Sequence, residues 1–126
     1  MRVTLLSRRP ATVRVGVEGP RGSHELPAVV DTGASVTLIA PSVATDLGYD
    51  LRAAAKSEVQ TVSGVEVMPR VVLDRVTVGD CSVEGVRAVC YRMPDAQVRA
   101  VLGLSFLQQF RATLSIKENS LELADP

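Results

Sequence analysis

Residues 29–39 decide how this chain is interpreted, and they read Val29-Val30-Asp31-Thr32-Gly33-Ala34-Ser35-Val36-Thr37-Leu38-Ile39. Two apolar residues lead into an acid, a Thr-Gly break follows, and a second apolar run continues the chain. Because Val29 and Val30 are typical strand residues, we expect Asp31 at a strand end, where burial beside them would desolvate its carboxylate. Such a carboxylate is costly unless it serves a function. Asp31 is therefore the candidate catalytic residue.

The residues after Asp31 fit a tight loop around its carboxylate. Gly33 allows the backbone to turn closely, so that its amide can donate a hydrogen bond to the acid. Thr32 can hold this loop through its hydroxyl, and Ala34 and Ser35 complete it. Asp-Xaa-Gly is also ordinary turn chemistry. The triplet alone is therefore a weak signal, and its flanking strands and a second motif carry the interpretation.

The second motif lies near the end of the chain and reads Val101-Leu102-Gly103-Leu104-Ser105-Phe106-Leu107. Together the two motifs resemble those of the retropepsin-like aspartic peptidases of bacteria and eukaryotes. In that family an apolar-apolar-Gly segment, matched here by Val101, Leu102 and Gly103, crosses beneath the catalytic loop. A hairpin between the motifs forms a flap over the substrate, matched here by Thr61, Val62, Ser63, Gly64 and Val65.

The resemblance implies an all-β fold, a closed acid-protease barrel with one or two short helices, in a single domain over residues 1–126. It also implies an aspartic endopeptidase that acts on a polypeptide through activated water, with no metal and no organic cofactor. No other Asp is followed by Thr-Gly or Ser-Gly, so one chain supplies one catalytic carboxylate. A homodimer would bring a second Asp31 across a two-fold axis, with Thr32 of each subunit locking the loops together.

Two positions depart from the viral members of the family. Those members usually carry an acid directly after Asp-Thr-Gly-Ala and an Arg directly after the Gly of the second motif. This chain has Ser35 and Leu104 there. The intersubunit ion pairs of the viral enzymes are therefore absent, and the chain looks cellular or bacterial.

Two other functions fit parts of the same pattern. A catalytically silent retropepsin-like dimerisation or peptide-binding module would keep the fold and Asp31. The phosphate loop of actin-like ATPases also places an acid and a Gly after a strand. That fold needs two large lobes, for which a chain of 126 residues has no room.

The composition of the chain narrows its possible partners and location. Hydrophobic residues make up 46% of the chain and aromatic residues only 3%, so the core must be aliphatic. Fourteen basic residues balance fourteen acidic ones, which gives no electrostatic reason to expect nucleic acid or a membrane as a partner. No apolar run reaches the length of a membrane span, and the first ten residues lack the apolar stretch of a secretory signal. We therefore expect a cytoplasmic protein.

The periodicity of apolar residues predicts many short strands and two helices. Strands are expected at 13–17, 26–30, 36–39, 71–78, 82–91 and 101–102, hairpins at 58–67 and 112–123, and helices from Pro41 to Gly48 and from Ser105 to Phe110. Pro27 suggests a strand edge.

Several remaining residues receive structural interpretations. His24, the only histidine, is expected in a solvated loop, and Tyr49 at the edge of the core. Cys81 and Cys90 are nine positions apart, which in a single strand would place them far apart and on opposite faces. They could meet only if the chain turned between them, at Glu84-Gly85, and we expect reduced thiols. They have no further Cys or His at metal-ligand spacing.

The aliphatic residues around the Asp-Thr-Gly motif predict apolar substrate subsites.

Overall fold

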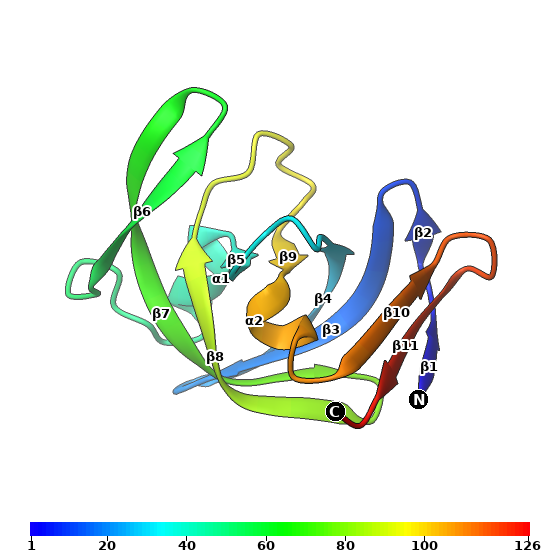
Figure 1. The fold of residues 1–126 in the computed structure, drawn as a ribbon. Coiled ribbons are helices and arrows are strands. Elements are labelled where there is room, and N and C mark those ends of the chain that lie inside the picture. The colour runs from blue at the N-terminus through cyan, green and yellow to red at the C-terminus, as the bar shows by residue number, and fades with distance from the viewer.

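The computed structural model describes residues 1–126, and strands dominate it (Figure 1). The strands are β1 (Arg2–Thr4), β2 (Ser7–Arg8), β3 (Ala11–Gly19), β4 (Gly22–Val30), β5 (Thr37–Ile39), β6 (Lys56–Thr61), β7 (Gly64–Val78), β8 (Cys81–Cys90), β9 (Ala100–Leu102), β10 (Arg111–Ser115) and β11 (Ser120–Ala124). The helices are α1 (Pro41–Asp46) and α2 (Leu104–Leu107). Neither helix is long and apolar enough to cross a membrane.

Six strands close into a barrel in the order β3-β4-β9-β5-β8-β7, with β7 pairing back onto β3. Closure comes from the antiparallel contact of residues 16–18 with residues 75–77. Most neighbouring strands are antiparallel, whereas β4 with β9 and β5 with β8 are parallel. The closed all-β barrel with two short helices is the fold that the motifs imply.

The barrel interior is aliphatic, as the composition predicts. β3 alternates between buried and more exposed residues, and Val13, Val15 and Val17 are all at most 2% exposed. They belong to one cluster of 25 buried residues, in which Phe106 of α2 is fully buried. Period-two alternation therefore places one face of β3 in the core.

A second sheet stands beside the barrel and joins the two ends of the chain (Figure 1). Its order is β1-β11-β10, with Arg2 opposite Glu122 and Arg111 opposite Ala124. The hairpin of β10 and β11 was predicted, but β1 and β2 were not. These two strands are too short to show alternation, and β1 depends on a partner at the far end of the sequence.

The predicted boundaries of β7 and α2 were wrong. β7 runs unbroken over 15 residues from Gly64 to Val78, although Pro69 lies within it. It tolerates Pro69 because that residue pairs only with Lys56 of β6, while pairing to β8 begins at Arg70. α2 ends at Leu107, which is earlier than predicted.

His24 lies within β4, opposite Val17, rather than in a loop, although its side chain is 45% exposed. Pro27 also lies within β4, where β3 is the only neighbour, because β9 pairs with β4 only at residues 29–30. Cys81 and Cys90 are free thiols, as predicted, and lie at opposite ends of β8.

Candidate active site

Asp31 is the first residue after β4, at the end of the barrel wall. Its amide donates a 3.1 Å hydrogen bond to the carbonyl of Leu102 in β9. The Gly33 amide donates a 2.8 Å hydrogen bond to Asp31 Oδ1, which confirms the contact predicted from the sequence. The loop of residues 31–35, called the Asp31 loop below, thus holds its carboxylate in one orientation.

The carboxylate is not buried as expected, because Asp31 is exposed in the single chain. Val30, the residue before it, is only 8% exposed because it still belongs to the barrel wall. Asp31 lies beyond the end of that wall, so the neighbouring valines do not cover it. Within a single chain, the neighbouring residues therefore do not shield the Asp31 carboxylate from water.

The second motif lies directly against the Asp31 loop. β9 passes between β4 and β5, and the Leu104 amide donates a 2.8 Å hydrogen bond to the Ala34 carbonyl. A Cβ atom at Gly103 would lie 2.4 Å from the carbonyl oxygen of Val36 and 2.7 Å from that of Ala34. Only glycine permits this close crossing.

Two buried hydroxyl groups that the sequence interpretation missed join the motifs. Thr37 and Ser105 are 3% and 7% exposed, and their hydroxyl oxygens lie 3.1 Å apart. The Ser105 hydroxyl accepts a 2.9 Å hydrogen bond from the Thr37 amide and donates one of 2.9 Å to the Arg87 carbonyl. The Gly103 amide donates to Thr37 Oγ1 at 3.3 Å. The sequence signal for this contact was the presence of Thr37 and Ser105, two small polar residues, within the apolar runs 36–39 and 104–107.

The Thr32 hydroxyl does not hold the loop within one chain. Thr32 is exposed, and its hydroxyl makes no hydrogen bond within the chain. The predicted role of this residue, locking two loops together, therefore depends on a second subunit.

A groove of about 480 Å³, called the Asp31 groove below, lies between the Asp31 loop and β6. From the loop side it is lined by Asp31, Gly33, Ala34 and Ser35, continued by Val36 and Leu38. From the opposite side it is lined by Ser57, Glu58, Val59 and Gln60, with Val89 at its base. The groove is large enough for amino-acid side chains, and its only carboxylates are those of Asp31 and Glu58.

The predicted flap is the hairpin of β6 and β7, which stands out from the barrel (Figure 1). Its tip is ordered by Thr61, whose hydroxyl donates to the Gly64 carbonyl at 2.9 Å and accepts from the Ser63 amide at 3.2 Å. The strand rather than the tip lines the Asp31 groove. Thr61 and Val62 line a neighbouring cavity with Leu38, whereas Ser63, Gly64 and Val65 line neither.

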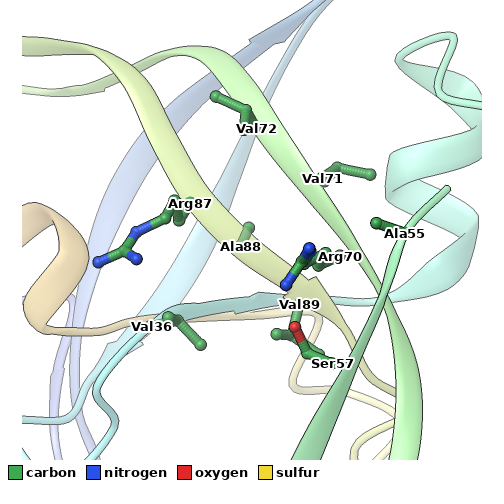
Figure 2. A pocket seen from close by; sticks show the side chains of 9 residues that line it. All are labelled: Val36, Ala55, Ser57, Arg70, Val71, Val72, Arg87, Ala88 and Val89. Atoms are coloured by element: carbon green, nitrogen blue, oxygen red, sulfur yellow. The ribbon is translucent and has the colours of Figure 1, made fainter.

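A second cavity of about 440 Å³ adjoins the Asp31 groove and shares Val36, Ser57 and Val89 with it. Arg70 and Arg87 enter this cavity from β7 and β8 (Figure 2). We call it the arginine cavity. Strand pairing places these two arginines beside the apolar residues of the cavity.

The potential metal-ligating side chains of the chain are scattered. No three His, Cys, Asp or Glu side chains lie close enough together to hold an ion. His24 instead approaches Asp46 at 3.9 Å on the outside of the barrel.

A closed barrel with an Asp-Thr-Gly loop over a crossing apolar segment defines a retropepsin-like aspartic peptidase. Residues 11–106 match the model of the aspartyl protease family, and the chain belongs to that family. The fold is similar to the crystal structure of a retropepsin-like aspartic protease from Rickettsia conorii, with a TM-score of 0.69 and 19% identity over 96% of this chain and 86% of that one. A search of curated protein sequences found no match. Family and fold together support a protease.

Proposed function

We propose that the protein is an aspartic endopeptidase that works as a homodimer, with one Asp31 from each subunit. The observation that carries the proposal is the position of Asp31. Its carboxylate is held by the Gly33 amide, is exposed at the open end of the barrel and lines a groove. A single chain places no second Asp-Thr-Gly in that groove.

The dimer supplies what the single chain lacks. A two-fold axis beside Asp31 brings the same residue of the partner subunit to it, and the exposed Thr32 hydroxyls become available to the facing loop. The second loop also covers the first and removes water from the carboxylates. Dimerisation therefore provides both the second acid and the desolvation.

The chemistry follows from the electrostatics of two neighbouring carboxylates. They cannot readily both ionise, so the pair holds one proton and titrates as a unit. The ionised acid takes a proton from a water molecule between them, while the protonated acid polarises the scissile carbonyl. The water oxygen bonds to the carbonyl carbon and forms a tetrahedral diol. The C–N bond then breaks as a proton passes to the leaving amine.

The substrate is proposed to be an extended polypeptide. A peptide that lies between the Asp31 loop and β6 passes alongside strand backbone, as in other cases of strand addition. Closure of the hairpin over the peptide would exclude water from the reacting bond.

The test compares three proteins on an unbiased peptide library, with products identified by mass spectrometry. Asp31→Asn should lose cleavage by about 10²- to 10⁴-fold, the range that a general acid or base contributes. Asp80→Asn, an exposed turn residue, is the matched control and should cleave like wild type. Equal cleavage by wild type and Asp31→Asn would indicate a contaminating protease. No cleavage by a wild-type protein that sediments as a dimer would favour the peptide-binding module.

A further inference from the structure

The arginine cavity carries two positive charges and no negative one. Among its nine lining residues, the only charged side chains are Arg70 and Arg87. The ion pairs of the structure involve Arg2, His24 and Arg75, so neither cavity arginine has a carboxylate partner within the chain. Two unpaired arginines that line one cavity are available to an anion from outside.

Strand pairing explains why both side chains line the cavity. Arg70 lies opposite Val89, and Val72 lies opposite Arg87, in the antiparallel ladder of β7 and β8. Residues two apart on a strand share a face, so Arg70 and Arg87 are diagonal neighbours on one face of the ladder. In Figure 2 the two side chains extend on either side of Ala88. The hydrogen bond from Ser105 to the Arg87 carbonyl fixes the β8 backbone at this point.

The cavity adjoins the groove that holds Asp31. Val36, Ser57 and Val89 belong to both, whereas none of Asp31, Gly33 and Ala34 reaches the arginine cavity. A peptide strand that passes Asp31 can therefore place a side chain in the arginine cavity. That side chain does not belong to the residues that flank the scissile bond.

We propose that the arginine cavity is a specificity subsite for a Glu or Asp side chain of the substrate, an inference that rests on the proposed peptidase function. The guanidinium groups supply forked donors that match a carboxylate. Val36 and Val72, which also line the cavity, would contact the methylene groups that carry it. The negative charges in the Asp31 groove, on Asp31 and Glu58, disfavour an acidic residue nearer the scissile bond.

The binding test uses the full chain with Asp31→Asn, so that bound peptides are not cleaved. A library of N-acetylated, C-amidated peptides is passed over the immobilised protein, and the bound fraction is sequenced by mass spectrometry. Blocked termini ensure that any carboxylate recognised belongs to a side chain. We expect Glu or Asp to be enriched at one position, and matched peptides to bind about five- to tenfold more tightly with Glu than with Gln there.

Variants assign the preference to the two arginines. In the Asp31→Asn background, Arg70→Gln combined with Arg87→Gln should reduce the Glu preference to less than about twofold. Arg14→Gln, at an exposed strand position outside the cavity, should keep it. Replacing both cavity arginines with Glu should shift the preference to Lys. Circular dichroism and sedimentation check that each variant keeps the fold and oligomeric state of its parent.

The outcomes separate this inference from the peptidase function. Failure to retain any peptide, retention without acid enrichment, or enrichment that survives the double Gln substitution overturns the subsite. Equal cleavage of matched Glu and Gln peptides by wild type also overturns the subsite and leaves the peptidase standing. Arginine-dependent selection of acidic peptides with no cleavage by wild type supports the subsite and rejects the peptidase.

Discussion

The Leu104 amide donates its hydrogen bond directly to the Ala34 carbonyl at 2.8 Å, so the second motif holds the Asp31 loop in place. The adjacent Gly103 passes so close to the same loop that it has no room for a side chain. The position of the candidate catalytic acid is therefore fixed by a segment distant in the sequence.

Gly103→Ala should displace the Asp31 loop, because the new Cβ would lie 2.4 Å from the Val36 carbonyl oxygen. We expect the free energy of unfolding to fall by about 1–3 kcal/mol, with a loss of cleavage larger than the stability change explains. Urea denaturation and peptide cleavage measure the two effects. Gly16→Ala is the control, since its Cβ would meet Thr77 at an ordinary 3.8 Å. A stable and fully active Gly103→Ala protein would show that the crossing is looser than the structure indicates.

Ser105→Ala should destabilise the fold by about 1–3 kcal/mol, because it leaves the buried Thr37 amide and the Arg87 carbonyl without their partner. Ser23→Ala, at an exposed position in β4, should change stability by less than about 0.5 kcal/mol. Chemical denaturation of both variants at the same protein concentration makes the comparison. Equal effects would contradict a supporting role for the buried hydroxyl.

Thr32→Val should weaken the proposed dimer by about tenfold or more, because each interface loses hydroxyl hydrogen bonds from both subunits. The single chain should be unaffected, since Thr32 is exposed and its hydroxyl has no partner within the chain. Sedimentation equilibrium gives the dissociation constant, and Thr32→Ser, which keeps the hydroxyl, is the control. A dimer that is equally tight with Val would place the interface elsewhere.

Cys90 should resist alkylation in the folded protein. It is 1% exposed, and burial raises the pKa of its thiol to about 11, so the reactive thiolate is scarce at about pH 8. Cys81 is only half-buried and should react with iodoacetamide at least about tenfold faster. Peptide mapping by mass spectrometry follows each site. Denaturant should equalise the two rates, and equal rates without denaturant would disprove the burial of Cys90.

Tyr49 should couple stability to alkaline pH. Burial raises the pKa of Tyr49 to about 12, whereas an unfolded tyrosine ionises near about pH 10. Between these values the unfolded chain releases a proton that the folded chain retains, so this contribution lowers stability as pH rises. Near neutral pH, Tyr49→Phe loses the 3.0 Å hydrogen bonds with the Val72 carbonyl and the Asp74 amide.

Urea unfolding at about pH 8 and about pH 11 tests this coupling. Tyr49→Phe should be less stable than wild type by about 1 kcal/mol at the lower pH, and the difference should shrink at the higher pH. Tyr91→Phe is the control for general alkaline effects. A constant difference between wild type and Tyr49→Phe would contradict the raised pKa.

The features that could be predicted from the sequence depend on residues close together along the chain. The alternation of Val13, Val15 and Val17 predicted a half-buried strand, and Pro41 and Gly48 predicted the ends of a helix. The Gly33 contact with Asp31 was predictable because both atoms lie within three residues. These features need no information from distant parts of the chain.

The missed features depend on tertiary contacts. The exposure of Asp31 reflects where the barrel wall ends, which no property of Val29 or Val30 encodes. Arg70 and Arg87 lie on different strands, and only the register of β7 against β8 brings them to one cavity. The charge of this cavity was therefore invisible in the residues around the Asp-Thr-Gly motif.

The unbroken strand β7 connects the hairpin beside the Asp31 groove to the barrel. One 15-residue strand forms half of the hairpin, then the barrel wall, and finally the seam with β3. Its hydrogen-bonded partner changes from β6 to β8 between Pro69 and Arg70. If the hairpin moves relative to the barrel, β7 has to bend at this change of partner. In the proposed closure over a peptide, Pro69 and Arg70 would therefore be the residues at which the hairpin turns relative to the barrel, and Arg70 also lines the arginine cavity.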